Sequence, residues 1–131
     1  MKSILALALL MVGISCSKSS SDNEPTSADR DKFVGTWAGT YSCSGGIPVS
    51  DTLVISLGSG ALDFTITIHV EALNPDTVSG ELTEPNLINV PEQLLGGFPG
   101  TAQITTQGDL LSFHQTGAGL TCGGTDYSLV H

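Results

Sequence analysis

The chain has 131 residues and a formal net charge of −9, with 13 acidic residues against 4 lysine and arginine residues. This length has room for one domain. The acidic balance argues against a nucleic-acid partner, because phosphate binding requires clustered cations.

Residues 1–15 have the layout of an export leader. Lys2 precedes an unbroken apolar run, Ile4–Val12, which is shorter than the roughly twenty residues of a membrane span. The following residues, Gly-Ile-Ser-Cys, end at Cys16 and resemble the lipobox of bacterial lipoproteins. The resemblance implies lipidation of Cys16 and an anchor in the bacterial envelope, with the outer membrane as the expected site. The alternative is a plain signal peptide followed by an incidental cysteine.

The segment 16–31 is rich in Ser, Asp and Glu and almost free of apolar side chains. It therefore predicts a flexible polar tether, because it cannot bury enough apolar surface to offset its ordering entropy. Its start resembles the acidic export tract of surface-displayed lipoproteins in some Gram-negative bacteria. A linker selected only for solubility has the same composition, so display at the cell surface stays open.

Residues 32–131 predict a single all-β domain, because short runs of alternating apolar and polar residues are separated by Gly, Asn, Asp and Pro. The first run, Phe33–Cys43, places aromatic side chains on one face. The next two runs also alternate with period two. The side chains expected to point inward are Leu53, Ile55 and Leu57 from Thr52–Leu57, and Phe64, Ile66, Ile68 and Val70 from Asp63–Val70.

Weaker patterns complete a set of about eight predicted strands. Pro91 requires a sheet edge, a bulge or a helical turn over Pro91–Leu95. Gln107-Gly108-Asp109 predicts a hairpin, and the glycine-rich Gly117–Gly124 predicts a loop before the last strand. An up-and-down barrel and a two-sheet sandwich both fit, and closure into a barrel is favoured because it removes exposed edges. The weaker runs are Thr77–Thr83, Leu87–Leu95, Thr101–Thr106, Leu110–Thr116 and Tyr127–Val130.

Two cysteines remain once Cys16 is assigned to lipid. Export to an oxidising compartment allows Cys43 and Cys122 to pair. Cys43 ends the first predicted strand and Cys122 comes just before the last, so a barrel that closes on these strands brings them together. Two free thiols are the alternative, and a metal pair lacks neighbouring ligands in the sequence.

The start of the β domain carries a second resemblance. Phe33-Val34-Gly35-Thr36-Trp37 resembles the Gly-x-Trp opening of lipocalin-like barrels, the calycin group. The resemblance covers the first strand and the general run of strands. It implies a lipocalin-like barrel that holds a small apolar ligand.

The aromatic face of the first strand supplies the candidate ligand-binding residues, Phe33, Trp37 and Tyr41. Aromatic side chains inside a barrel either line a ligand pocket or fill the interior, because eight strands leave little space. We expect a non-catalytic binding module for a small hydrophobic ligand. The alternative is a surface interaction protein with a packed interior, which binds an envelope protein or a glycan through its loops or its Thr-rich outer faces.

Catalytic and metal-binding patterns are not evident in the sequence. His69 and His114 fall on polar strand faces and predict solvated side chains, although Asp63 and Glu71 lie near His69 in sequence. His131 is the last residue and predicts a frayed end. We find no nucleophile elbow, zinc-binding helix or phosphate loop, and so expect neither an enzyme nor a cofactor.

Overall fold

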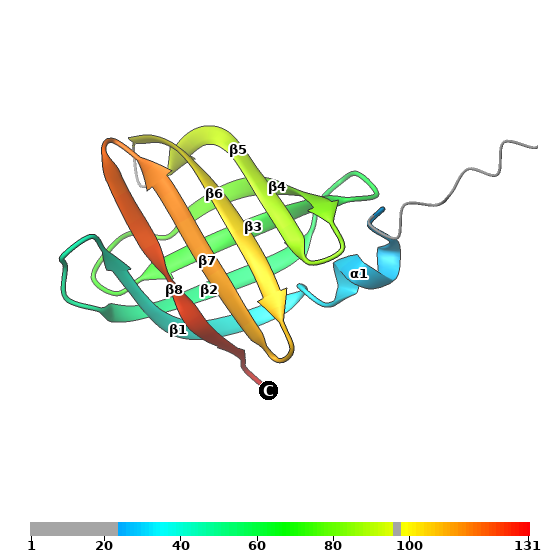
Figure 1. Ribbon diagram of the computed structural model, residues 1–131, viewed down its shortest axis with the longest axis horizontal. Helices are drawn as coiled ribbons and strands as arrows, with labels where there is room; N and C mark the ends of the chain where they lie inside the picture. The colour runs from blue at the N-terminus through cyan, green and yellow to red at the C-terminus, as the bar shows by residue number, and fades with distance from the viewer. Residues whose placement is uncertain (1–23, 96–97) are drawn as a thin grey trace, which may run out of the picture.

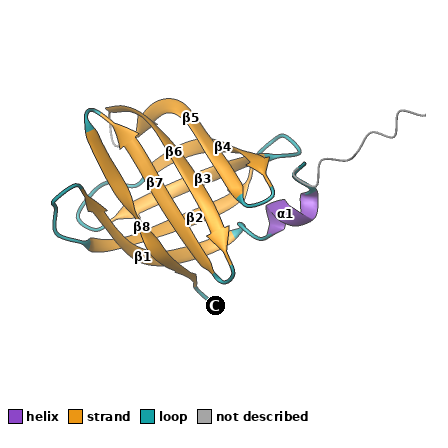
Figure 2. Cartoon of the chain, in the orientation of Figure 1, coloured by secondary structure: helices purple, strands orange, loops and turns teal. Residues whose placement is uncertain are grey.

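The structure is a computed structural model that describes residues 24–95 and 98–131. One short helix precedes a run of antiparallel strands (Figures 1 and 2). The strands form a closed barrel in which each pairs with its neighbour in sequence and β1 pairs with β8. The elements are α1 Ser27–Asp31, β1 Gly35–Cys43, β2 Val49–Leu57, β3 Asp63–Val70, β4 Asp76–Glu84, β5 Leu87–Leu95, β6 Phe98–Gln107, β7 Leu110–Gly117 and β8 Leu120–Leu129.

The predicted all-β class and up-and-down barrel are confirmed, and the sandwich alternative is not what forms. Alternation produces this result because every second side chain of a strand points into the barrel. Most of the side chains expected inside from β2 and β3 are buried, and Val70 is half-buried. The prediction that Leu57 points inward is wrong. Its side chain is 47% exposed, because the end of β2 extends beyond the packed interior.

The hairpin prediction is confirmed between β6 and β7. Gln107 pairs with Leu110, and Gly108 has a positive φ of 62° in the turn between them. The helical turn considered for Pro91–Leu95 is not observed. The chain stays in β5 and accommodates Pro91 through a register shift between Val90 and Gln93.

The end of the chain differs from the prediction. Gly117–Gly124 is not a loop, because β8 already begins at Leu120 and continues to Leu129. Glycine serves a packing purpose in this strand. A Cβ on Gly123 would lie 1.9 Å from the carbonyl oxygen of Phe113, and one on Gly124 would lie 1.9 Å from that of Thr40. The glycines therefore let β8 approach both neighbours closely instead of marking a loop.

Helix α1 was not expected from the polar composition of the segment 16–31, of which residues 24–31 are described. A capping box begins it, in which Thr26 and Asp29 bond to each other's backbone N–H groups. Arg30 then donates to the carbonyl oxygens of Gly60, at 3.3 Å, and Ala61, at 2.6 Å. These contacts hold α1 against the β2–β3 loop, at one end of the barrel (Figure 1).

The two barrel ends are different. The end beside α1 is filled by Phe33, whose ring packs edge-on against Phe64 at a centroid distance of 5.9 Å. We call it the closed end. The opposite end, which we call the mouth, is formed by the loops that follow β1, β3 and β7, by the end of β5 and by the start of β6.

Candidate functional site

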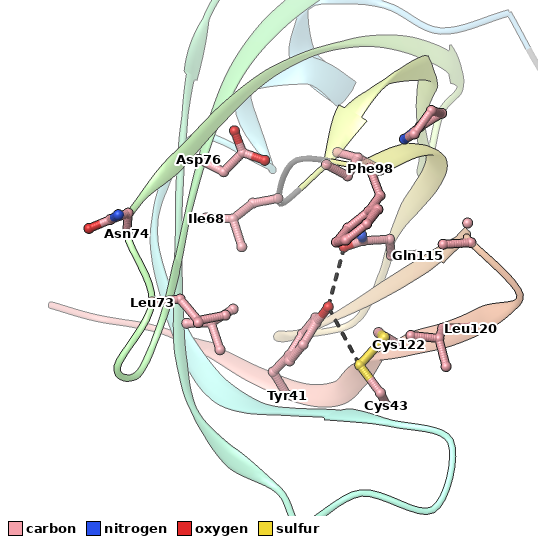
Figure 3. A pocket seen from close by; sticks show the side chains of 15 residues that line it. Tyr41, Cys43, Ile68, Leu73, Asn74, Asp76, Phe98, Gln115, Leu120 and Cys122 are labelled. Carbon is pink, nitrogen blue, oxygen red and sulfur yellow. Dashed lines mark hydrogen bonds between the residues drawn. A yellow bond between two sulfur atoms is a disulfide. The ribbon is translucent and has the colours of Figure 1, made fainter.

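The mouth contains a cavity of about 220 Å³. Its walls are mainly apolar and come from both sides of the barrel (Figure 3). Apolar surface that faces water at this open end is unfavourable, so an apolar group that fills the cavity would be stabilised there. The apolar side chains that line it include Ile68, Val70, Leu73, Leu95, Phe98 and Leu120.

Several apolar side chains at the mouth are exposed. Leu73 is 67% exposed, Phe98 63% and Leu120 52%, and all three also line the cavity. Ile47, in the loop after β1, is 87% exposed. Isolated exposed apolar residues are ordinary on protein surfaces, but a ring of them around an apolar cavity marks a place where an apolar molecule can enter.

Tyr41 brings a polar group into the cavity. Its hydroxyl donates to Oε1 of Gln115 at 3.4 Å and lies 3.9 Å from Sγ of Cys43 (Figure 3). Its ring stacks on Phe113, with centroids 6.2 Å apart. Burial, and then the charge of Asp51, raise the pKa of this hydroxyl above its usual value. Tyr41 is therefore a neutral hydrogen-bonding group on an apolar wall.

The other two predicted ligand residues lie elsewhere. Phe33 is fully buried at the closed end, and Trp37 is 4% exposed. The indole Nε1 of Trp37 donates to the carbonyl oxygen of Phe33 at 2.9 Å. Of the three predicted aromatic residues, Tyr41 alone lines the cavity at the mouth, while the other two pack the interior. The alternating pattern predicted that the three aromatic side chains share one face of the strand. It could not show at which end of the barrel a cavity remains.

The predicted disulfide is present. Cys43 and Cys122 are bonded and face each other in the register of β1 with β8. Both residues line the cavity, so the bridge forms part of its wall (Figure 3). It also joins the two strands that close the barrel, where the register shifts between Ala38 and Ser42. The disulfide is compatible with an extracytoplasmic location.

A buried pair, Asp51 and Tyr127, lies inside the barrel. Asp51 is 2% exposed, and its Oδ2 accepts a hydrogen bond of 2.5 Å from the Tyr127 hydroxyl. The pair spans β2 and β8, which flank β1, and the Tyr127 ring crosses at Gly39. A Cβ on Gly39 would lie 2.8 Å from that ring. Glycine at this position therefore allows the two side chains to meet.

Asp51 is only partly satisfied by this contact. Its Oδ1 is buried and has no hydrogen-bond partner. Burial raises the pKa of the carboxyl group, although hydrogen bonds from Tyr127 and from the Thr52 backbone oppose the shift. Asp51 pairs across the strands with Val70, a cavity-lining residue. The carboxyl group therefore lies next to the cavity wall without lining it.

Sequence reasoning missed Asp51 and the mouth residues Leu73, Phe98 and Leu120. Asp51 carried a detectable signal, because it is in phase with the buried Leu53 and Ile55 on one face of β2. The three residues at the mouth had no comparable signal in the sequence. They are single apolar side chains near glycine- and proline-containing turns, and only barrel closure brings them together.

The histidines behave as predicted solvated groups. His69 and His114 are exposed on the outer faces of β3 and β7. Asp63 accepts from the Gly60 backbone N–H at 3.1 Å, and Glu71 accepts from that of Ser50 at 3.4 Å. Both carboxylates therefore support loops. Within residues 24–95 and 98–131, no three His, Cys, Asp or Glu side chains are grouped so that they could hold a metal ion.

Comparison with known proteins adds no family assignment. No protein-family model matches the chain, and no curated protein matches it.

In the described part of the chain, no helix is long and apolar enough to cross a membrane. The leader 1–15 and Cys16 lie outside the described residues.

Proposed function

We propose that this barrel is a non-catalytic binding module for a small hydrophobic ligand, of lipocalin-like type. The observation that carries the proposal is the apolar cavity of about 220 Å³ at the mouth. Burial of an apolar ligand there removes both the ligand surface and the exposed side chains Leu73, Phe98 and Leu120 from water, which is favourable.

The size of the cavity limits the ligand. Pockets for drug-sized molecules span roughly 300–1,000 Å³, so this cavity suits a small molecule or one end of a longer amphiphile. The competing role, a surface interaction protein that binds an envelope protein or a glycan, predicts an interior that is filled throughout. The closed end meets that description. The mouth does not, and this difference favours the ligand-binding role.

Filling the cavity should weaken ligand binding. We expect 1-octanol to bind the barrel in a calorimetric titration, and Val70→Phe to weaken that binding at least about tenfold by occupying the space. The matched control is Val54→Phe, because Val54 lies between the buried Leu53 and Ile55 and so faces outward. Failure of the wild-type barrel to bind 1-octanol, or equal binding by the Val70→Phe variant, would refute the proposal.

We also propose that the chain is a lipoprotein of the bacterial envelope, anchored through Cys16 after removal of residues 1–15. The oxidised Cys43–Cys122 pair supports export. Helix α1, the first described element, lies at the closed end (Figure 1). An anchor that precedes α1 in the chain would therefore attach the barrel by its closed end and leave the mouth accessible to ligands.

Metabolic labelling tests the anchor. When the full chain is expressed in a Gram-negative host supplied with an alkyne fatty acid, the wild-type protein should carry the label and sediment with membranes. Cys16→Ser should lose both properties, because acyl chains provide the membrane affinity. An unlabelled wild-type protein would show that the leader is an ordinary signal peptide. Label retained by the Cys16→Ser variant would show that the acyl chain is attached elsewhere, and either result would refute anchoring through Cys16.

A further inference from the structure

Two polar side chains meet on the apolar wall of the cavity. Tyr41 and Gln115 both line it, and the Tyr41 hydroxyl donates to Oε1 of Gln115 (Figure 3). Tyr41 is in phase with the buried Trp37 on the inner face of β1. Gln115 is likewise in phase with the buried Phe113 on β7. The pair therefore belongs to the barrel wall and is not carried by a loop.

The strand register explains why the two side chains reach each other. Gln115 pairs with Cys122 across β7 and β8, and Cys122 pairs with Cys43 across β8 and β1. Tyr41 is two positions from Cys43, on the same face of β1. The pair therefore lies beside the disulfide, and stacking on Phe113 holds the Tyr41 ring in place.

The hydrogen bond between the two side chains is long. The Tyr41 hydroxyl oxygen and Oε1 of Gln115 are 3.4 Å apart, whereas a well-formed O–H···O bond spans roughly 2.5–3.0 Å. A second neighbour of the hydroxyl is Sγ of Cys43, at 3.9 Å, and a disulfide sulfur is only a weak acceptor. The hydroxyl and the amide therefore keep hydrogen-bonding capacity for a further partner.

The polar pair lies deeper than the apolar side chains at the entrance. Tyr41 and Gln115 are half-buried. Leu73, Phe98 and Leu120, which we call the apolar rim, are each more than half exposed. In an apolar pocket, a small number of polar groups fix the orientation of the ligand. A ligand that fills this cavity meets the hydrogen-bonding groups inside and hydrocarbon side chains at the rim.

An alcohol with a short chain has two orientations in such a cavity. If the chain entered first, its methylene groups would cover the Tyr41 hydroxyl and the Gln115 amide without replacing their contacts with water, which is costly. If the hydroxyl group entered first, it could accept from one side chain and donate to the other. The hydrocarbon chain would then cover the apolar rim and remove it from water. The second orientation therefore satisfies both kinds of surface.

We propose that the cavity takes alcohols with the hydroxyl end first. The ligand hydroxyl group accepts a hydrogen bond from Tyr41 and donates one to Gln115, and the hydrocarbon chain packs against the apolar rim. This inference rests on the proposed ligand-binding function, and it names the ligand class and the two specificity-determining residues.

The test compares 1-octanol with 1-fluorooctane, in which fluorine replaces the hydroxyl group on the same chain. Fluorine cannot donate a hydrogen bond, so the ratio of the two dissociation constants reports the contacts of the ligand hydroxyl. Tyr41→Phe keeps the aromatic ring and should lower the preference for 1-octanol about fivefold, which corresponds to one hydrogen bond. Gln115→Met keeps the length of the side chain and should lower the preference by a similar factor. Calorimetric titration measures both dissociation constants.

The matched control is Thr40→Val, which removes a hydroxyl group from the exposed face of β1 and should leave the ratio unchanged. Both probes are measured on each variant, so a partly unfolded variant loses binding of both and keeps its ratio. Binding of both probes with the wild-type ratio in Tyr41→Phe and Gln115→Met overturns the inference and leaves the proposed function intact. An equal fall in Thr40→Val overturns it too. Failure of both probes to bind the wild-type barrel refutes the proposed function itself.

Discussion

Serine at both Cys43 and Cys122 should lower the free energy of unfolding by about 4 kcal/mol. The bridge joins residues separated by 79 positions in sequence. In the chain-entropy model, a cross-link that closes a loop of this length lowers the entropy of the unfolded chain and so stabilises the folded state by about 4.5 kcal/mol. Urea denaturation of the oxidised wild-type protein and of the double variant measures the difference. A domain of about a hundred residues has only roughly 5–15 kcal/mol of total stability, so the loss is large.

The double variant has a matched control in the wild-type protein under reducing conditions, which should unfold at the same urea concentration. The first amides to lose hydrogen-exchange protection should belong to β1 and β8, because the bridge joins these strands beside their register shift. A loss below about 1 kcal/mol would show that the barrel closes without help from the bridge.

Tyr127→Phe should lower the free energy of unfolding by about 2 kcal/mol, because it removes the one side-chain donor to Asp51 and leaves a buried carboxyl group without it. The ring stays in place over Gly39, so packing changes little. Asp51→Asn provides the second arm of a double-mutant cycle. Additive effects of the two substitutions would show that the pair makes no net contribution.

The same pair predicts a dependence of stability on pH. Burial raises the pKa of Asp51 in the folded protein above its usual value of 3.8, so the folded state holds this proton more tightly than the unfolded state. The stability that Asp51 contributes is therefore fully present below pH 3.8 and is lost as the pH rises through the raised pKa. Relative to Asp51→Asn, the wild-type protein should lose stability from acid to neutral pH. A constant difference would contradict this prediction.

The sequence pattern predicted most strands because alternation reports directly which side chains face the interior. The pattern failed to predict segments whose backbone conformation depends on contacts with distant parts of the chain. β8 contains Gly123 and Gly124, and such a pair normally indicates a loop. Glycine occupies these two strand positions because neighbouring carbonyl oxygens leave no room for a Cβ. Likewise, the polar composition before residue 32 does not reveal α1, which is held by contacts from Arg30 to a distant loop.

The amino-acid sequence predicted the β class and the inward faces of most strands, and it favoured pairing of Cys43 with Cys122 over two free thiols. These properties follow from local alternation and from the count of cysteines left to pair. That Phe33 and Trp37 pack the interior while Tyr41 borders a cavity, and that Asp51 meets Tyr127 beside Gly39, became evident from the three-dimensional structure. The physical reason is that position along the barrel axis depends on the register between strands, and register depends on contacts between residues far apart in the chain.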